Sequence, residues 1–210
     1  MEAKVYNSNG EPTGNSLSLP ESIFGIEPND HAIYLDVKQY LANQRQGTHK
    51  SKDKSEVQYS TRKLKRQKGT GTARAGSRKS GVMVGGGRIH GPRPRNYSFK
   101  LNKKLKDLAR FSALSYKAKD ACVSVIEDLS FEKPSTQAFS SVLKNMNLGN
   151  QRTLFLIDSP DANVQLSGRN IPKNKVLVAS SINTYEVMLA KHLIVTPKAL
   201  DLIKDTFKKG

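Results

Sequence analysis

The chain has 210 residues, of which 36% are hydrophobic, and this is enough for one compact domain with a core. It holds 35 Lys and Arg against 18 Asp and Glu, a formal net charge of +17. Such a charge indicates a polyanionic partner, nucleic acid first and an anionic membrane second. No run of about 18 apolar residues occurs, which argues against a membrane-spanning helix. The single cysteine, Cys122, excludes an internal disulfide.

The first part of the chain indicates one strand and one long helix. Residues 3–6 suit a short edge strand, and a loop is expected from there through Pro20. Asn29 or Asp30 can cap a helix that runs to about residue 43. The apolar face of this helix is expected to comprise Ile33, Val37, Tyr40 and Leu41.

The whole excess of positive charge lies between Asn43 and Arg110. This segment holds 20 Lys and Arg against three acids, whereas the rest of the chain balances 15 basic with 15 acidic residues. The three acids are Asp53, Glu56 and Asp107. No acid occurs between Val57 and Lys106. Binding is therefore expected to reside in this segment, and we define residues 45–96 as the basic arm.

The composition of the basic arm is unusual in other ways. Nine of the 15 glycines lie in the charged segment, and large apolar residues are sparse there. A segment that cannot bury its own surface cannot offset the entropy of becoming ordered, so we expect the arm to be mobile alone and ordered on its partner. Glycine lets the backbone approach phosphates, and arginine forks onto phosphate oxygens and stacks on bases. RNA is therefore favoured over a solvated linker, and over a membrane because no amphipathic helix is present.

The predicted contacts to RNA are made by the cationic side chains of the arm and by the start of the helix that follows it. Aromatic side chains could add stacking on unpaired bases, and these are His49, Tyr59, His90, Tyr97 and Phe99. The predicted RNA-binding residues are Arg45, His49, Lys50, Lys54, Arg62, Lys63, Lys65, Arg66, Lys68, Arg74, Arg78, Lys79, Arg88, Arg93, Arg95, Lys103 and Lys104.

The arm is followed by a second long helix. Asn102 is expected to cap it, and it should end near residue 119. Its apolar stripe is expected to consist of Leu101, Leu105, Leu108, Phe111 and Leu114. The next run, residues 122–126, indicates a buried strand that also buries the Cys122 thiol.

Strand and helix patterns then alternate to the C-terminus. Strands are expected at residues 153–157, 176–179 and 192–195. Helices are expected after the caps Ser135 and Thr196, and at residues 162–166 and 183–189, with the first of them ended by Gly149. The buried positions of the first and last helices are expected to be Phe139, Val142, Leu143 and Met146, and Ala199, Leu200, Ile203 and Phe207. This alternation predicts an α/β fold with a mostly parallel sheet, flanking helices and a long internal loop, so that residues 1–44 and 97–210 form one globular domain around the arm.

A cofactor, a metal or an active site is not expected. Gly69-Thr70-Gly71 and residues 85–91 are rich in glycine, but a dinucleotide fingerprint follows a strand, opens a helix and is trailed by an acid, and neither run does so. The four histidines are dispersed without metal-ligand spacing. Asp158 follows a predicted strand at the place where α/β enzymes bind ligands, yet a turn or cap role is the simpler interpretation. No pairing of a nucleophile with a base is recognisable, which argues against an enzyme.

Several motifs of the chain resemble the signature of the bacterial large-subunit ribosomal protein four family. The matching runs are RQGTH at 45–49, KSEV at 54–57, RQKGTGTARAGS at 66–77, GGG at 85–87, GPRPR at 91–95 and LARFSALSYK at 108–117. The chain departs from the family at Lys63-Leu64-Lys65, where members commonly read Lys-Pro-Trp, and it contains no tryptophan.

The resemblance implies an α/β domain on the surface of the large subunit and a loop that threads into the large-subunit rRNA. It further implies that the loop tip helps to form the constriction of the nascent-peptide exit tunnel, and the tip residues would be Arg66, Gln67, Lys68, Gly69, Thr70 and Gly71. Arg74, Gly76, Arg78 and Lys79 match the returning limb. The implied partners are large-subunit rRNA, neighbouring ribosomal proteins and the nascent peptide, in the cytoplasm and without a homo-oligomer.

Two other classes of protein remain open. One is a nucleic-acid-modifying enzyme whose α/β body is catalytic, and activity on RNA that Asp158→Asn abolishes would favour it. The other is a histone-like protein that compacts DNA, and equal affinity for duplex DNA and for an rRNA fragment would favour that class.

Overall fold

The computed structural model describes the chain through residue 208, and its side chains through residue 205. The described chain separates into two compact units, residues 1–41 with 100–208, and residues 42–99. We call the first the globular unit and the second the arm unit; the basic arm, 45–96, lies within the arm unit. Among the described residues no helix is long and apolar enough to cross a membrane.

The globular unit is built on a six-stranded sheet with the strand order β2-β1-β3-β6-β4-β5. The strands are β1 (Glu2–Tyr6), β2 (Pro12–Ser18), β3 (Val123–Ile126), β4 (Thr153–Ile157), β5 (Asn174–Val178) and β6 (His192–Val195). All neighbouring strands run parallel except β1 and β2. The predicted α/β class with a mostly parallel sheet is therefore confirmed.

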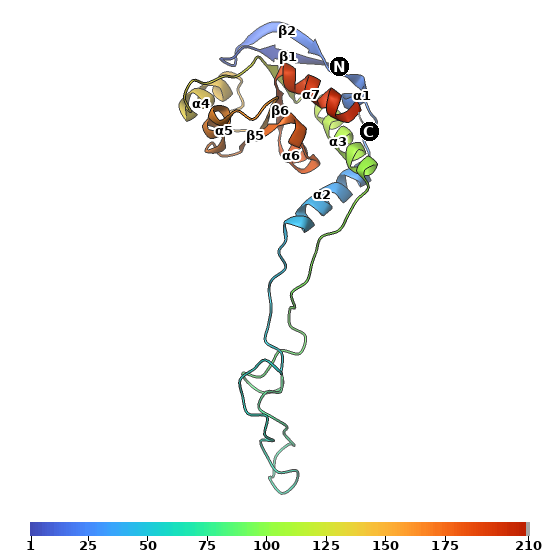
Figure 1. The fold of residues 1–210 in the computed structure, drawn as a ribbon, viewed down its shortest axis with the longest axis vertical. Helices are drawn as coiled ribbons and strands as arrows, with labels where there is room; N and C mark the ends of the chain where they lie inside the picture. Colours follow the sequence, from blue (N-terminus) through green and yellow to red (C-terminus); the bar gives the residue numbers. More distant parts are fainter. Residues whose placement is uncertain (209–210) are drawn as a thin grey trace. The chain divides into compact units, whose positions relative to one another are not determined.

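The helices are α1 (Glu21–Phe24), α2 (Asp30–Gln44), α3 (Lys103–Lys119), α4 (Thr136–Asn145), α5 (Ala162–Arg169), the 3-10 turn η1 (Ala179–Ser181), α6 (Thr184–Leu189) and α7 (Pro197–Lys208). They cover both faces of the sheet, except for α2, which leads into the arm (Figure 1). One apolar cluster joins α1, α3, α6 and α7 to the sheet, and a second joins α4 and α5 to it. Strand β4 contributes Leu154 and Leu156 to the first cluster, and Phe155 and Ile157 to the second. Successive side chains of a strand point to opposite faces, so its continuous apolar run reflects a sheet covered on both sides.

Three predicted helix caps are confirmed, because their side-chain oxygens accept hydrogen bonds from backbone N–H groups in the first turn. Asn29 Oδ1 accepts from the backbone N–H of Ala32 at 2.9 Å, and Ser135 Oγ accepts from that of Ala138 at 3.3 Å. Thr196 Oγ1 likewise accepts from Ala199 at 3.3 Å. Asn102 does precede α3, but its side chain makes no capping hydrogen bond.

The predicted loop through Pro20 is wrong, because residues 12–18 form the edge strand β2. Its residues lack an apolar alternation, since all of them are exposed or half-buried. An edge strand needs only backbone pairing on one side, and β1 provides it. Gly10, with φ of +84°, and the Asn7 side chain, which accepts from the N–H groups of Asn9 and Glu11, form the turn between the two strands.

The predicted apolar stripe of α3 is also largely wrong. Of its five leucine and phenylalanine positions only Leu114 is buried, and the others are half-buried. The buried face instead consists of small residues, Ala109, Ser112, Ala113 and Ser115. Small side chains let a helix approach its neighbours closely, and a search for large apolar residues overlooks such a face.

Smaller differences concern single positions. Leu41, expected to be buried, is 44% exposed, and Val37 and Tyr40 are half-buried. Helix α4 ends at Asn145 rather than at Gly149. The Cys122 thiol is half-buried and donates to the carbonyl oxygen of Asp120. Ala199, Leu200 and Ile203 are buried as predicted, whereas the Phe207 side chain lies outside the described part of the chain.

Candidate nucleic-acid interface

The basic arm consists of two limbs that run side by side without helix or extended strand (Figure 1). Only one isolated bridge, between Lys63 and Ser77, has strand-like pairing among its described residues. Backbone hydrogen bonds join the limbs, with N···O distances of 2.9–3.1 Å. The N–H groups of Arg95, Arg88 and Leu64 donate to the carbonyl oxygens of Gly47, Lys52 and Gly76, respectively. These contacts fix the register of the two limbs along most of their length.

The six residues that the sequence assigns to the loop tip lie in the closing turn beyond the bridge between Lys63 and Ser77. All six are exposed. Gly69 and Gly71 have φ of +80° and +64°, and no atom lies within 4 Å of a Cβ built on either of them. Lys65 Nζ donates to Thr72 Oγ1 at 2.6 Å across the turn. The tip is thus a narrow loop whose outer surface is free.

The cationic side chains that the sequence predicts as RNA contacts are exposed, with the half-buried Lys79 as the one exception. Two of them form ion pairs with acids of the arm: Lys50 with Glu56, and Arg93 with Asp53 at 2.9 Å. The bond from Lys50 lowers the pKa of Glu56 below its usual value. The other predicted cations have no carboxylate partner among the described residues. Their charges remain available to an external polyanion.

Two arginines gather around one aromatic ring at the base of the arm. The guanidinium carbons of Arg45 and Arg95 lie 3.7 and 4.4 Å from the ring centroid of Tyr97. Nε2 of His49 lies 3.4 Å from the Tyr97 hydroxyl. A hydrogen bond with Arg95, supported by the charges of Arg95 and Arg45, lowers the pKa of the Tyr97 phenol. The ring therefore holds two arginines in place and offers little free surface for the base stacking that the sequence suggested.

A glycine makes this arrangement possible. Gly47 has φ of +65°, and a Cβ at this position would lie 2.1 Å from the carbonyl oxygen of Arg95 and 2.9 Å from the Tyr97 ring. The close approach of the limbs at the base of the arm thus requires a residue without a side chain. Sequence reasoning missed this pairing, although RQGTH at 45–49 and the tyrosine at 97 were both visible.

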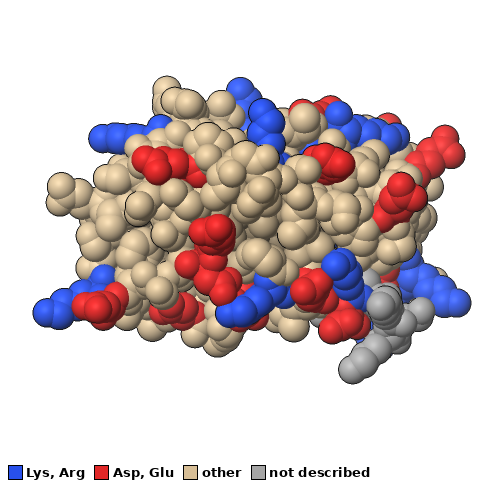
Figure 2. All heavy atoms as spheres, turned by 90° about the horizontal axis from the view of Figure 1, so that it is seen from above, with Lys and Arg blue, Asp and Glu red and all other residues tan. Residues whose placement is uncertain are grey.

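The globular unit has a different charge pattern. On the face shown in Figure 2, Lys and Arg side chains alternate with Asp and Glu. Lys103 and Lys104 are exposed at the start of α3, where the helix dipole disfavours cations, so helix stability does not explain them. Asp158 directly follows β4. Within the described residues no group of His, Cys, Asp or Glu could hold a metal ion.

Comparison with known proteins gives a consistent result. The profile of the ribosomal protein L4/L1 family matches residues 17–206. The chain is 54% identical to the large ribosomal subunit protein uL4 of Porphyromonas gingivalis, over 99% of this chain and all of that protein. Its identity to the uL4 proteins of Parabacteroides distasonis and Flavobacterium johnsoniae is 54% and 53%, over 99% and 100% of this chain and all of each relative.

Proposed function

Because the chain belongs to the ribosomal protein L4/L1 family and is a structural constituent of the large ribosomal subunit, we propose that its basic arm binds large-subunit rRNA and that its tip lines the nascent-peptide exit tunnel. The membership confirms the family resemblance seen in the sequence. It also agrees with the expectations that the chain is not an enzyme and that it resides in the cytoplasmic ribosome.

The observation that carries the proposal is the set of exposed cations in the arm that no carboxylate neutralises. A folded chain gains nothing from crowding like charges, because they repel one another. Phosphates of RNA relieve this repulsion, and each phosphate that is neutralised also releases condensed counterions. Glycines and backbone pairing keep the two limbs slender, which suits insertion between RNA helices. The arm therefore acts as a scaffold where helices of the rRNA approach one another.

The placement of the tip in the tunnel rests on its residues and on its shape. Residues 66–71 read RQKGTG, which begins the run RQKGTGTARAGS that resembles the family signature. They lie at the end of the paired limbs, and their side chains are exposed. The rRNA contacts, the neighbouring ribosomal proteins and the nascent peptide are the partners that this function requires.

One experiment tests both parts of the proposal. The full chain carries a photo-crosslinking residue at Thr70 and is expressed in cells, and ribosomal subunits are separated by sedimentation. We expect the chain in the large-subunit fraction, with crosslinks to nascent peptide. A matched chain with the probe at Val84, which is 98% exposed in the same arm, should sediment alike and give no such crosslink. Absence from the large-subunit fraction would overturn the assignment, and nascent-chain crosslinks at both positions or at neither would contradict the position of the tip.

A further inference from the structure

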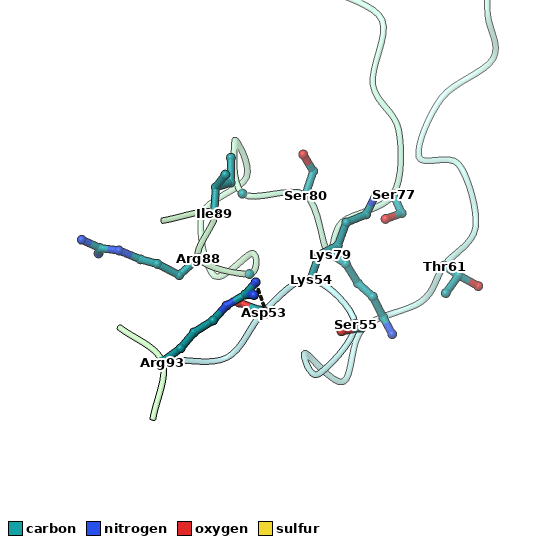
Figure 3. A pocket seen from close by; sticks show the side chains of 12 residues that line it. Asp53, Lys54, Ser55, Thr61, Ser77, Lys79, Ser80, Arg88, Ile89 and Arg93 are labelled. Carbon is teal, nitrogen blue, oxygen red and sulfur yellow. Dashed lines mark hydrogen bonds and ion pairs between the residues drawn. The ribbon is translucent and has the colours of Figure 1, made fainter. Parts of the chain in front are cut away.

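A hollow with a volume of about 950 Å³ lies between the two limbs of the basic arm (Figure 3). This volume falls at the upper end of the range of about 300–1,000 Å³ that is typical of ligand sites. Both limbs line the hollow, the outgoing limb with Asp53 and the returning limb with Lys79, Ser80, Arg88, Ile89 and Arg93. It lies away from the tip, and the function proposed above uses cations at its rim but assigns no ligand to the hollow itself.

Backbone contacts between the limbs build this hollow. Gly87 is buried in its wall, and a Cβ there would lie 2.4 Å from the backbone nitrogen of Lys54. The N–H of Arg88 donates across the limbs to the carbonyl oxygen of Lys52 at 2.9 Å, and within the returning limb the N–H of Gly87 donates to that of Lys79 at 3.0 Å. Main-chain groups hold the walls, so the shape of the hollow depends little on flexible side chains.

Its chemistry differs from that of the rest of the arm. Asp53 is one of the three acids in the charged segment and the only carboxylate that lines the hollow. Arg93 donates to its Oδ2 at 2.9 Å, which leaves Oδ1 without a hydrogen-bond partner among the described residues. A carboxylate repels phosphate but accepts hydrogen bonds from the N–H groups on the edge of a base. Asp53 therefore selects a base rather than the backbone of a nucleic acid.

The other lining groups complete such a site. The Ile89 side chain, which is 66% exposed, offers an apolar surface for a base. The Ser80 hydroxyl can donate or accept, and the ammonium of Lys79 stands ready for the sugar and phosphate. In Figure 3, the side chains of Asp53 and Arg93 meet at one side of the hollow.

We propose that this hollow binds one unpaired nucleotide of the large-subunit rRNA, whose base edge donates hydrogen bonds to the carboxylate of Asp53. Guanine fits best because its N1–H and N2–H groups lie side by side and match a carboxylate. The site rests on the proposed rRNA-binding function and adds a base-reading contact to the phosphate contacts of the arm. The simpler role for Asp53 is to fasten the limbs through Arg93, which is 40 residues away in the chain.

Chemical probing of the rRNA in complex with the full-length protein separates the two roles. Kethoxal reports on the N1 and N2 positions of unpaired guanines, and dimethyl sulfate reports on unpaired adenine and cytosine. The wild-type chain should protect one unpaired base. Asp53→Asn should lose this protection and about tenfold in affinity, although it removes a negative charge from an RNA-binding arm. Glu56→Gln is the matched control, since it removes the same charge from a carboxylate that does not line the hollow. Glu56 Oε2 accepts from the backbone N–H of Asp53 at 3.2 Å, and the amide oxygen of Gln can accept the same bond, so this variant should keep the protection.

A double variant, Asp53→Asn with Arg93→Gln, replaces the ion pair with two amides that can hydrogen-bond between the limbs and leaves no carboxylate among the side chains that line the hollow. A base-reading role predicts that the protection stays lost in this variant. Protection that survives Asp53→Asn, or that returns in the double variant, overturns the inference while the rRNA-binding function stands. A wild-type chain that fails to bind the rRNA contradicts the proposed function, and this inference with it.

Discussion

His192 begins β6, and its Nε2 lies 2.8 Å from Oγ of Ser124 on the neighbouring strand β3. Burial, and to a smaller extent the charge of Lys117, lowers the pKa of His192 below its usual value. The sequence shows this histidine only as one of four dispersed ones. Its surroundings depend on the pairing of strands that lie nearly seventy positions apart in the chain, which no local pattern records. The same holds for the packing of Arg45 on Tyr97. The cations of the arm could be predicted, because their charge and exposure are local properties.

The histidine gives the globular unit a pH-dependent stability. The folded state has the lower pKa, so below about pH 6.5, the usual pKa of His, the unfolded chain binds more protons. The contribution of neutral His192 to the free energy of unfolding is fully present above that pH. This contribution is lost as the pH falls towards the pKa that His192 has in the folded state. Urea unfolding of the wild type should therefore show a lower free energy of unfolding at pH 5.5 than at pH 7.5. His192→Gln should have a smaller difference between the two pH values, and an unchanged difference would show that another group is responsible.

At the scale of helices and strands, prediction succeeded where a residue acts within its own element. The caps Asn29, Ser135 and Thr196 and the apolar run of β4 are of this kind. It failed at β2, whose pairing comes entirely from the backbone of β1, and at α3, whose buried face is defined by the space that its neighbours leave. Both failures have one cause, because tertiary contact rather than hydrophobic periodicity determines the element's environment.

The small-residue face of α3 can be tested by overpacking it. Ala113 is fully buried in the first apolar cluster. Ala113→Leu adds a side chain where no room exists, so it should lower the free energy of unfolding by about 1–3 kcal/mol. Lys119→Leu, at the exposed end of the same helix, should change it by less than about 0.5 kcal/mol. Urea titration of both variants provides the measurement, and equal stability of the two would mean that α3 does not pack through this face.

For the whole molecule, the α/β class and the segregation of charge both followed from the sequence, since alternation and composition extend over many residues. The pairing of the limbs and the hollow between them could not be predicted from the sequence. They depend on Gly47 and Gly87, whose close contacts lie 33 to 50 residues away in the chain. The ordering of the free arm on RNA stays a prediction. In the described structure the arm unit already has backbone hydrogen bonds between its limbs, so RNA would act on a partly organised arm rather than on a random chain.

The central claim is that the cations of the arm bind rRNA phosphates, and the salt dependence of binding tests it most directly. Affinity for large-subunit rRNA should fall with salt, with a slope of log K against log salt of roughly 0.7–0.9 per phosphate contact. Arg62, Lys68 and Arg74 are exposed and make no ion pair within the described chain, so changing all three to Gln should reduce the slope by about two to three. The matched control changes Lys133, Lys144 and Lys191, exposed lysines of the globular unit, to Gln and should leave the slope unchanged. A slope that stays the same in the arm variant and falls in the control would contradict the claim.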